Sequence, residues 1–240
     1  MPDLAGDDAL GYQTSRTDFG KTRALQLDAS YRLVHLPLVA PDHPDVIPSA
    51  EGKPYRMGKR PEVFSLVVPV DAGALTSSPG YGQLVDALHQ SQFAAKIDWA
   101  LLPRRSGILH ATIAGGLSGE PVAPALATLP AFDAELLGLF SGNINLGRLY
   151  LKLHPEKRDE GNAITGIQKA LGRVTTKLYL VGLFNLTDHL TEAETRELAV
   201  LIERFWSKPL LTFRVETLWL IGTSDDLALE ARIVERIALG

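Results

Sequence analysis

A histidine and a threonine two residues apart are the side chains of this sequence best suited to chemistry on a phosphate. His110 and Thr112 lie within residues 107–117, an apolar segment with flanking glycines that is typical of a strand. Alternate side chains of a strand project from the same face, so the imidazole and the hydroxyl would lie side by side. The imidazole can move a proton near neutral pH, and the hydroxyl can donate a hydrogen bond to a phosphate oxygen. The plainer interpretation is a buried, hydrogen-bonded histidine beside a threonine that only packs.

Two groups of basic residues could add positive charge to such a site. Arg104 and Arg105 precede the strand and could frame a phosphate entrance. Arg148, Tyr150 and Lys152 alternate along another predicted strand, where a basic and aromatic stripe can hold a nucleotide by charge and stacking. A solvated loop is the plainer interpretation of the arginine pair, and an ordinary solvent-exposed face is that of the stripe.

The composition limits other kinds of chemistry. The chain of 240 residues has no cysteine, which excludes disulfides, thiolate metal sites and cysteine nucleophiles. Residues 42–45 (Asp-His-Pro-Asp) carry metal-binding atoms, but no second cluster has suitable spacing, so we predict a turn there and no metal or other cofactor. A net charge of -4 argues against bulk nucleic-acid binding, but not against a nucleotide or an RNA end in a local basic groove. Neither a signal-peptide pattern nor a membrane-spanning apolar stretch is visible, so we expect a cytoplasmic protein without a membrane partner.

The elements that must position these residues follow from hydrophobic periodicity and turn residues. Residues 1–60 are rich in Pro, Gly and Asp and are expected to form an irregular N-terminal extension with one strand-like run at 31–38. In the rest of the chain, 61–240, the pattern predicts strands at 63–70, 107–117, 132–140, 147–153, 177–186 and 211–221, and helices at 82–97, 163–171 and 191–206. Asn162 is the expected cap of the second of these helices, and Thr191 with Glu194 forms the capping box of the third.

The order of these elements repeats. A strand, a helix or loop and a pair of strands run from His110 to Leu153, and the same order runs from Leu178 to the C-terminus. We therefore expect an α+β fold that is bilobed, with pseudo-two-fold antiparallel sheets, a central cleft and flanking helices.

In this element order the chain resembles the 2H phosphoesterase superfamily, which includes the LigT-like cyclic phosphodiesterases. The resemblance covers roughly residues 62–239, with His110-Ala-Thr112-Ile matching the first His-x-Thr-hydrophobic signature on the expected strand. It implies a cleft in which two histidines act as acid and base without a metal, while each Thr or Ser holds the phosphate. Such a cleft would hydrolyse a 2',3'-cyclic phosphate or a 2'-5' linkage of a nucleotide or RNA end.

The second signature of that family is degenerate in this sequence. An alignment on Gly182 places Leu178 and Leu180 where histidine and threonine belong, and neither leucine can carry a proton. A slip of one residue would instead aim Lys177 and Tyr179 into the cleft, where they could bind a phosphate electrostatically. His189-Leu-Thr191 follows shortly afterwards, but Thr191 is better explained as a helix cap.

Three functions remain open from the sequence. The first is a metal-independent phosphoesterase in which His110 is the acid or base and Thr112 positions the phosphate, with Arg104, Arg105, Lys177 and Tyr179 binding the substrate. The second is a catalytically degenerate module of the same fold that binds a nucleotide or an RNA end. The third is a fold that serves protein interaction only. The sequence leaves the oligomeric state and the exact substrate undetermined.

Overall fold

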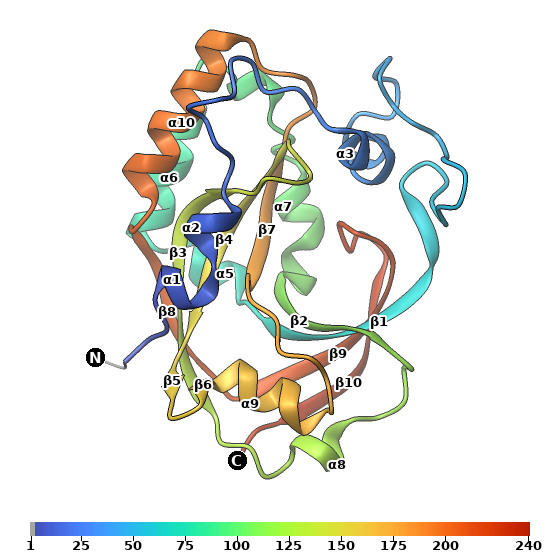
Figure 1. Ribbon diagram of the computed structural model, residues 1–240, viewed down its shortest axis with the longest axis vertical. Coiled ribbons are helices and arrows are strands. Elements are labelled where there is room, and N and C mark those ends of the chain that lie inside the picture. The colour runs from blue at the N-terminus through green and yellow to red at the C-terminus, as the bar shows by residue number, and fades with distance from the viewer. Residues whose placement is uncertain (1–2) are drawn as a thin grey trace.

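One antiparallel sheet of eight strands organises the fold (Figure 1). The computed structural model describes residues 3–240. Along the sheet the strand order is β10-β9-β1-β2-β7-β4-β3-β8. The strands are β1 (Lys59–Pro69), β2 (His110–Leu117), β3 (Phe132–Ser141), β4 (Arg148–Pro155), β7 (Leu180–Asn185), β8 (Pro209–Val215), β9 (Thr217–Asp225) and β10 (Ala231–Ala238). Two-residue strands β5 (Lys157–Arg158) and β6 (Gly161–Asn162) form a separate small hairpin.

Short helices flank this sheet. They are α1 (Asp7–Leu10), α2 (Tyr12–Ser15), α3 (Ala29–Val34), α4 (Leu36–Val39), α5 (Ala72–Thr76), α6 (Pro79–His89), α7 (Leu101–Arg105), α8 (Ala123–Leu126), α9 (Ala163–Ala170) and α10 (Glu192–Phe205). Two 3-10 turns lie at Ala94–Lys96 and Ser106–Ile108. The α+β class expected from the sequence is confirmed. No helix within residues 3–240 is long and apolar enough to cross a membrane.

The sheet curls strongly, and its two predicted central strands lie at its middle. Glu216 alone separates β8 from β9, although these strands belong to opposite ends of the strand order. The chain therefore bends sharply there and draws the two ends of the sheet together, as Figure 1 shows. In the middle, β2 and β7 are neighbours, joined by the single register pair Ala111 and Val181. Beyond that pair the two strands diverge.

Residues 3–58, called the N-terminal segment below, contribute to the same hydrophobic core as the sheet. In Figure 1, α1 and α2 lie over β3 and β4. Tyr12 is fully buried, and its hydroxyl lies 2.8 Å from the carbonyl oxygens of both Leu153 and Tyr179. Tyr31 is also fully buried. The segment consists of four short helices joined by loops, and it covers one face of the β4 and β7 strands.

Two elements differ from the sequence prediction. The run 31–38 is helical rather than extended, because the side chain of Asp28 caps α3 by accepting the backbone N–H of Tyr31. Pro37 sits in the first turn of α4, where a missing N–H is tolerated. The helix predicted at 82–97 ends as α6 at His89. For the run 31–38, the local apolar content did not distinguish a buried helix from a buried strand.

Candidate functional site

His110 and Thr112 lie on one face of β2, and Ala111 lies on the other. Ala111 is paired with Val181 of β7, and both side chains are fully buried. Because side chains alternate along a strand, His110 and Thr112 project from the opposite face of the sheet. His110 is partly buried and Thr112 is exposed.

The imidazole of His110 is held in one tautomer. Its Nδ1 atom lies 2.6 Å from the carbonyl oxygen of Ile108, which can only accept, so Nδ1 carries the proton and Nε2 keeps a free lone pair. Burial lowers the pKa of His110 to about 4; the hydrogen bond to Ile108 opposes this shift, and the charges of Arg105 and Arg148 reinforce it. The ring is therefore neutral at pH 7 and can accept a proton but not supply one.

Thr112 lines an open pocket of about 450 Å³ where β2 diverges from the chain entering β7. We call it the β2 pocket. One wall is β2, and the other is the loop between α9 and β7. Its lining residues are Thr112, Ile113, Ala114, Gly115, Gln168, Gly172, Arg173, Val174, Thr176, Lys177 and Leu178. This lining holds two cations and several hydrogen-bonding groups, and none of these residues is a carboxylate.

Hydrogen bonds hold the two walls of the β2 pocket together. Gln168 of α9 is buried, and its amide nitrogen donates to the carbonyl oxygen of Ile113 at 2.6 Å and to Thr176 Oγ1 at 2.7 Å. Arg173 donates from Nη2 to the carbonyl oxygen of Gly115 at 2.5 Å. These bonds fix the pocket shape without using Lys177, whose side chain remains exposed.

The register of β7 decides between the two alignments considered from the sequence. Leu180 pairs with Lys152 and Gly182 with Tyr150, so these four residues share one face. Tyr179 lies on the other face: it is 1% exposed, and its hydroxyl donates to the carbonyl oxygen of Thr176 at 2.7 Å. The expectation that Tyr179 enters the cleft is wrong. The pairing of β7 with β4 places Leu180 and Gly182 on the face that Tyr179 would have to occupy, and it turns the Tyr179 side chain to the opposite face.

Lys177 and Leu178 precede β7, and both line the β2 pocket. Leu178 has a φ of 64°, a left-handed conformation that is strained for a bulky residue. Its backbone N–H donates to the carbonyl oxygen of Leu10 in the N-terminal segment. The strand opposite His110 thus presents leucines and Gly182, and it contributes no group that transfers protons.

Arg104 and Arg105 have different environments and do not frame one entrance. Arg104 is exposed at the end of α7. Arg105 is 1% exposed and donates from Nη1 to the carbonyl oxygen of Gly182 at 2.9 Å. Burial, followed by the charge of Arg148, lowers the pKa of Arg105 to about 9. The expected pair of entrance arginines is wrong because the last turn of α7 directs one side chain inward and the other outward.

The stripe of Arg148, Tyr150 and Lys152 is largely covered, not solvent-exposed as the plainer interpretation had it. Lys152 is completely buried; its Nζ atom lies 2.9 Å from Asp7 Oδ1 and 3.7 Å from the centre of the Trp206 ring. The N-terminal segment supplies Asp7 and so covers the stripe. Sequence periodicity gave no signal for this cover, which comes from residues about 145 positions away.

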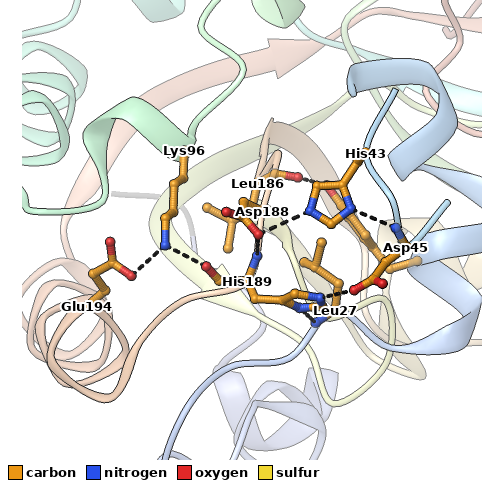
Figure 2. A network of polar contacts seen from close by, with 9 residues as sticks. Leu27, His43, Asp45, Lys96, Leu186, Asp188, His189 and Glu194 are labelled. Atoms are coloured by element: carbon orange, nitrogen blue, oxygen red, sulfur yellow. Dashed lines mark hydrogen bonds and ion pairs between the residues drawn. The ribbon is translucent and has the colours of Figure 1, made fainter. Parts of the chain in front are cut away.

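A second polar cluster ties the N-terminal segment to the loop after β7 (Figure 2). His43 Nε2 lies 3.1 Å from Asp188 Oδ1, and His189 Nε2 lies 2.6 Å from Asp45 Oδ2. Each ring accepts a backbone N–H at Nδ1, so each Nε2 carries the proton. We call these four residues the histidine clasp. Residues 42–45 lie in turns, as predicted, and no group of three or more potential ligands in residues 3–240 is placed to hold a metal ion.

The clasp continues into the start of α10. Lys96 Nζ donates to the carbonyl oxygen of His189 at 2.7 Å and to Glu194 at 2.8 Å (Figure 2). Thr191 and Glu194 form the predicted capping box, each side chain bonded to the backbone N–H of the other. The sequence His189-Leu-Thr191 therefore belongs to a helix start and not to a second phosphate signature.

Sequence reasoning missed Arg173 and Gln168, which complete the β2 pocket. Gln168 belongs to a helix and Arg173 to the loop that follows it, and no periodic or spaced pattern sets either apart. Only the tertiary contact of α9 with β2 brings them beside Thr112.

The class of protein defined by fold and site is an α+β protein whose curled antiparallel sheet carries a basic pocket beside its central strands. Among solved structures, the chain is similar to the crystal structure of TT0787 of Thermus thermophilus, with a TM-score of 0.39 and 12% sequence identity, over 74% of this chain and 97% of that chain. No family model and no curated protein matches the chain. Function is therefore inferred from the residues of the site.

Proposed function

We propose that the protein binds a phosphoester in the β2 pocket, in the manner of a 2H phosphoesterase-like module. The observation that carries this proposal is the composition of the pocket lining: Arg173 and Lys177 with the Thr112 hydroxyl, and no carboxylate among the lining residues. Three other pockets of the described chain mix cations with carboxylates, and a fourth has no charged residue. A volume of about 450 Å³ suits a nucleotide-sized ligand.

Each polar residue has a distinct part in this proposal. Lys177 supplies a mobile positive charge, and Arg173, already anchored on Gly115, supplies further guanidinium donors for phosphate oxygens. Thr112 donates its hydroxyl to a nonbridging oxygen. Gln168 has a structural part: its hydrogen bonds to Ile113 and Thr176 hold the two walls of the pocket at a fixed distance.

The ligand class comes from the resemblance to the 2H phosphoesterase superfamily. The proposed ligand is a 2',3'-cyclic phosphate or a 2'-5'-linked nucleotide, free or at an RNA end. In this proposal β10-β9-β1-β2 and β7-β4-β3-β8 are the two pseudo-symmetric lobes, and β2 and β7 are their inner strands. His110 and Thr112 would be the retained half of a two-sided site.

Hydrolysis is the second candidate function, and the tautomer of His110 favours it. Nε2 has a free lone pair and could take a proton from an attacking hydroxyl or water. The opposite strand offers leucines where a general acid would protonate the leaving oxygen. We therefore propose binding as the primary function, with hydrolysis slow and dependent on solvent for the second proton.

Binding of a fluorescent nucleoside 2',3'-cyclic phosphate tests the proposal. Thr112→Val and Lys177→Gln should each weaken binding by about tenfold, the loss expected for one hydrogen bond or charge contact to a phosphate. Thr175→Val is the matched control, since Thr175 is exposed beside the pocket but does not line it. Equal affinity of the Thr112 and Thr175 variants would show that the β2 pocket is not the site.

Turnover of the same ligand separates the two candidate functions. If hydrolysis occurs, His110→Asn should lower its rate by roughly 100-fold or more, because a general base is lost. If the wild type binds the ligand without hydrolysing it, the protein is a binding module. Hydrolysis at an unchanged rate in the His110 variant would remove this residue from the mechanism.

A further inference from the structure

Five buried polar atoms without hydrogen-bond partners gather beside β7. They are Nδ1 and Nε2 of His35, Nε of Arg105, Nε of Arg148 and Oδ1 of Asn185. Within the described residues only Arg32 and His154 contribute other atoms of this kind. Unpartnered buried polar groups are costly, so such a concentration points to a bound group that satisfies them.

Gly182 is the point at which the two arginines meet. Arg105 donates from Nη1 to the Gly182 carbonyl oxygen, and the Arg148 guanidinium packs so closely on the same residue that a Cβ there would lie under 3.0 Å from it. Arg148 also donates from Nη1 to the carbonyl oxygen of Asp226. The Nη1 atoms of Arg105 and Arg148 thus donate to backbone oxygens, while the Nε–H group of each arginine has no hydrogen-bond acceptor.

No ion pair within residues 3–240 neutralises these two arginines. All the carboxylate pairs of the described chain involve other residues. The charge of Asp225 favours the protonated form of Arg105, but both its oxygens accept backbone N–H groups, from Leu227, Leu229 and Glu230. Arg105 is buried and Arg148 is half-buried, and both guanidiniums contact Gly182 with a buried Nε–H and no bound carboxylate, which creates a local preference for an anion.

Residues of the N-terminal segment pack beside these unpartnered atoms. His35 is 1% exposed, and its ring packs on Tyr31 with centroids 5.3 Å apart. The hydroxyl of Tyr31 accepts the amide N–H of Asn185 at 3.0 Å, which links the segment to β7. Because the five unpartnered atoms are all buried, a small ligand suits them better than a nucleotide does.

We infer that a small oxyanion of the size of inorganic phosphate binds between the guanidiniums of Arg105 and Arg148 at Gly182, beneath the N-terminal segment. The Nε–H groups of both arginines donate to it. His35 borders the site and supplies a further polar ring. This buried site is distinct from the β2 pocket and does not depend on the function proposed for that pocket.

Thermal unfolding with inorganic phosphate as the probe tests the inference, with sodium chloride at equal ionic strength as the reference. Phosphate at about 100 times its Kd should raise the Tm of the wild-type protein by roughly 5 °C or more. Arg105→Gln should abolish the response, and Arg104→Gln, its exposed neighbour on α7, should keep it. Lys177→Gln should also keep it, because that residue belongs to the β2 pocket.

Two results would overturn the inference. A wild-type Tm that does not respond to phosphate would mean that water alone satisfies the five atoms. A response that survives in Arg105→Gln but disappears in Lys177→Gln would place the phosphate in the β2 pocket. Should Arg105→Gln fail to fold, Arg148→Lys takes its place: it keeps the charge but removes the Nε–H donor, so an unchanged phosphate response would again reject the site.

Discussion

Two groups of basic residues in this protein lie in opposite surroundings. Lys177 and Arg173 stand at the wall of an open pocket, whereas Arg105 and Lys152 are buried and Arg148 is half-buried with its Nε atom covered. The open group keeps its hydration, so it can exchange water for a ligand at little cost to folding. The covered group has lost much of its water, so it needs a partner from the protein or a bound anion, and without one it destabilises the fold. Changes to the open group should therefore affect binding with little effect on folding, whereas changes to the covered group should also affect stability.

The largest effect should come from removing the partner of a covered cation. Asp7→Ala leaves Lys152 buried without its carboxylate and also removes the acceptor of the Trp206 indole N–H, so the free energy of unfolding should fall by about 3–5 kcal/mol. Asp3→Ala is the matched control, since Asp3 pairs with the exposed Lys157 and should cost less than about 1 kcal/mol. Urea denaturation measures both. Equal losses would contradict the difference between covered and open cations.

Acid should destabilise the protein through its covered histidines. The pKa values of His35, His110 and His154 all lie below the ordinary value of 6.5, chiefly because of burial. The unfolded chain therefore binds these protons at a higher pH than the folded chain, and stability falls as the pH drops through 6.5 toward 4. His110 alone should cost roughly 2 kcal/mol between pH 7.5 and 5.

Denaturation curves at pH 7.5, 6 and 5 measure this loss, in a range above the ordinary titration of carboxylates. His35→Leu should reduce the dependence on pH, because it removes one buried ring that must stay neutral. It should not lower stability at pH 7.5 by much, since neither ring nitrogen has a partner to lose. A flat stability profile in the wild type would mean that these rings can be protonated without cost.

A smaller loss of stability should follow from adding a side chain at Gly182, the residue that the guanidiniums of Arg105 and Arg148 both contact. Gly182→Ala places a Cβ against the Arg148 guanidinium and should destabilise the fold by about 1–3 kcal/mol. Gly166→Ala in α9 is the control: a Cβ there meets nothing within 4 Å, so helix propensity should stabilise the protein by up to about 1 kcal/mol. If Gly182→Ala left the free energy of unfolding unchanged in chemical denaturation, the close contact of Arg148 with Gly182 would not be needed for stability.

The smallest effect on folding should come from the open pocket. Lys177→Gln should change the free energy of unfolding by no more than about 0.5 kcal/mol, because the side chain is exposed and carries no ion pair within the described chain. Its ligand affinity should nevertheless fall and should become less sensitive to salt. A stability loss above about 1 kcal/mol would indicate that Lys177 belongs to the covered group.

The strands around His110 could be predicted because alternation and turn residues are local signals. The hairpin of β3 and β4 and the capping box at Thr191 follow from the sequence for the same reason. The register of β7 could not be predicted, since a one-residue slip exchanges Tyr179 for Leu180 and only pairing with β4 fixes it. The burial of Lys152 was equally hidden, because its cover comes from the far end of the chain.

The N-terminal segment contacts residues far along the chain, and this sequence separation delays its packing during synthesis. Asp7 binds the indole of Trp206, 199 residues later in the chain. At ribosomal speeds of about 5–20 residues per second, Asp7 waits roughly 10–40 seconds for its partner to be synthesised. For most of that interval β4 has not been synthesised, and after it emerges the indole beside the Asp7 and Lys152 pair is still missing while the sheet lacks β8, β9 and β10. The contacts of the N-terminal segment are thus complete only after Trp206 is synthesised, and a nascent chain is exposed to misassociation until β8, β9 and β10 emerge.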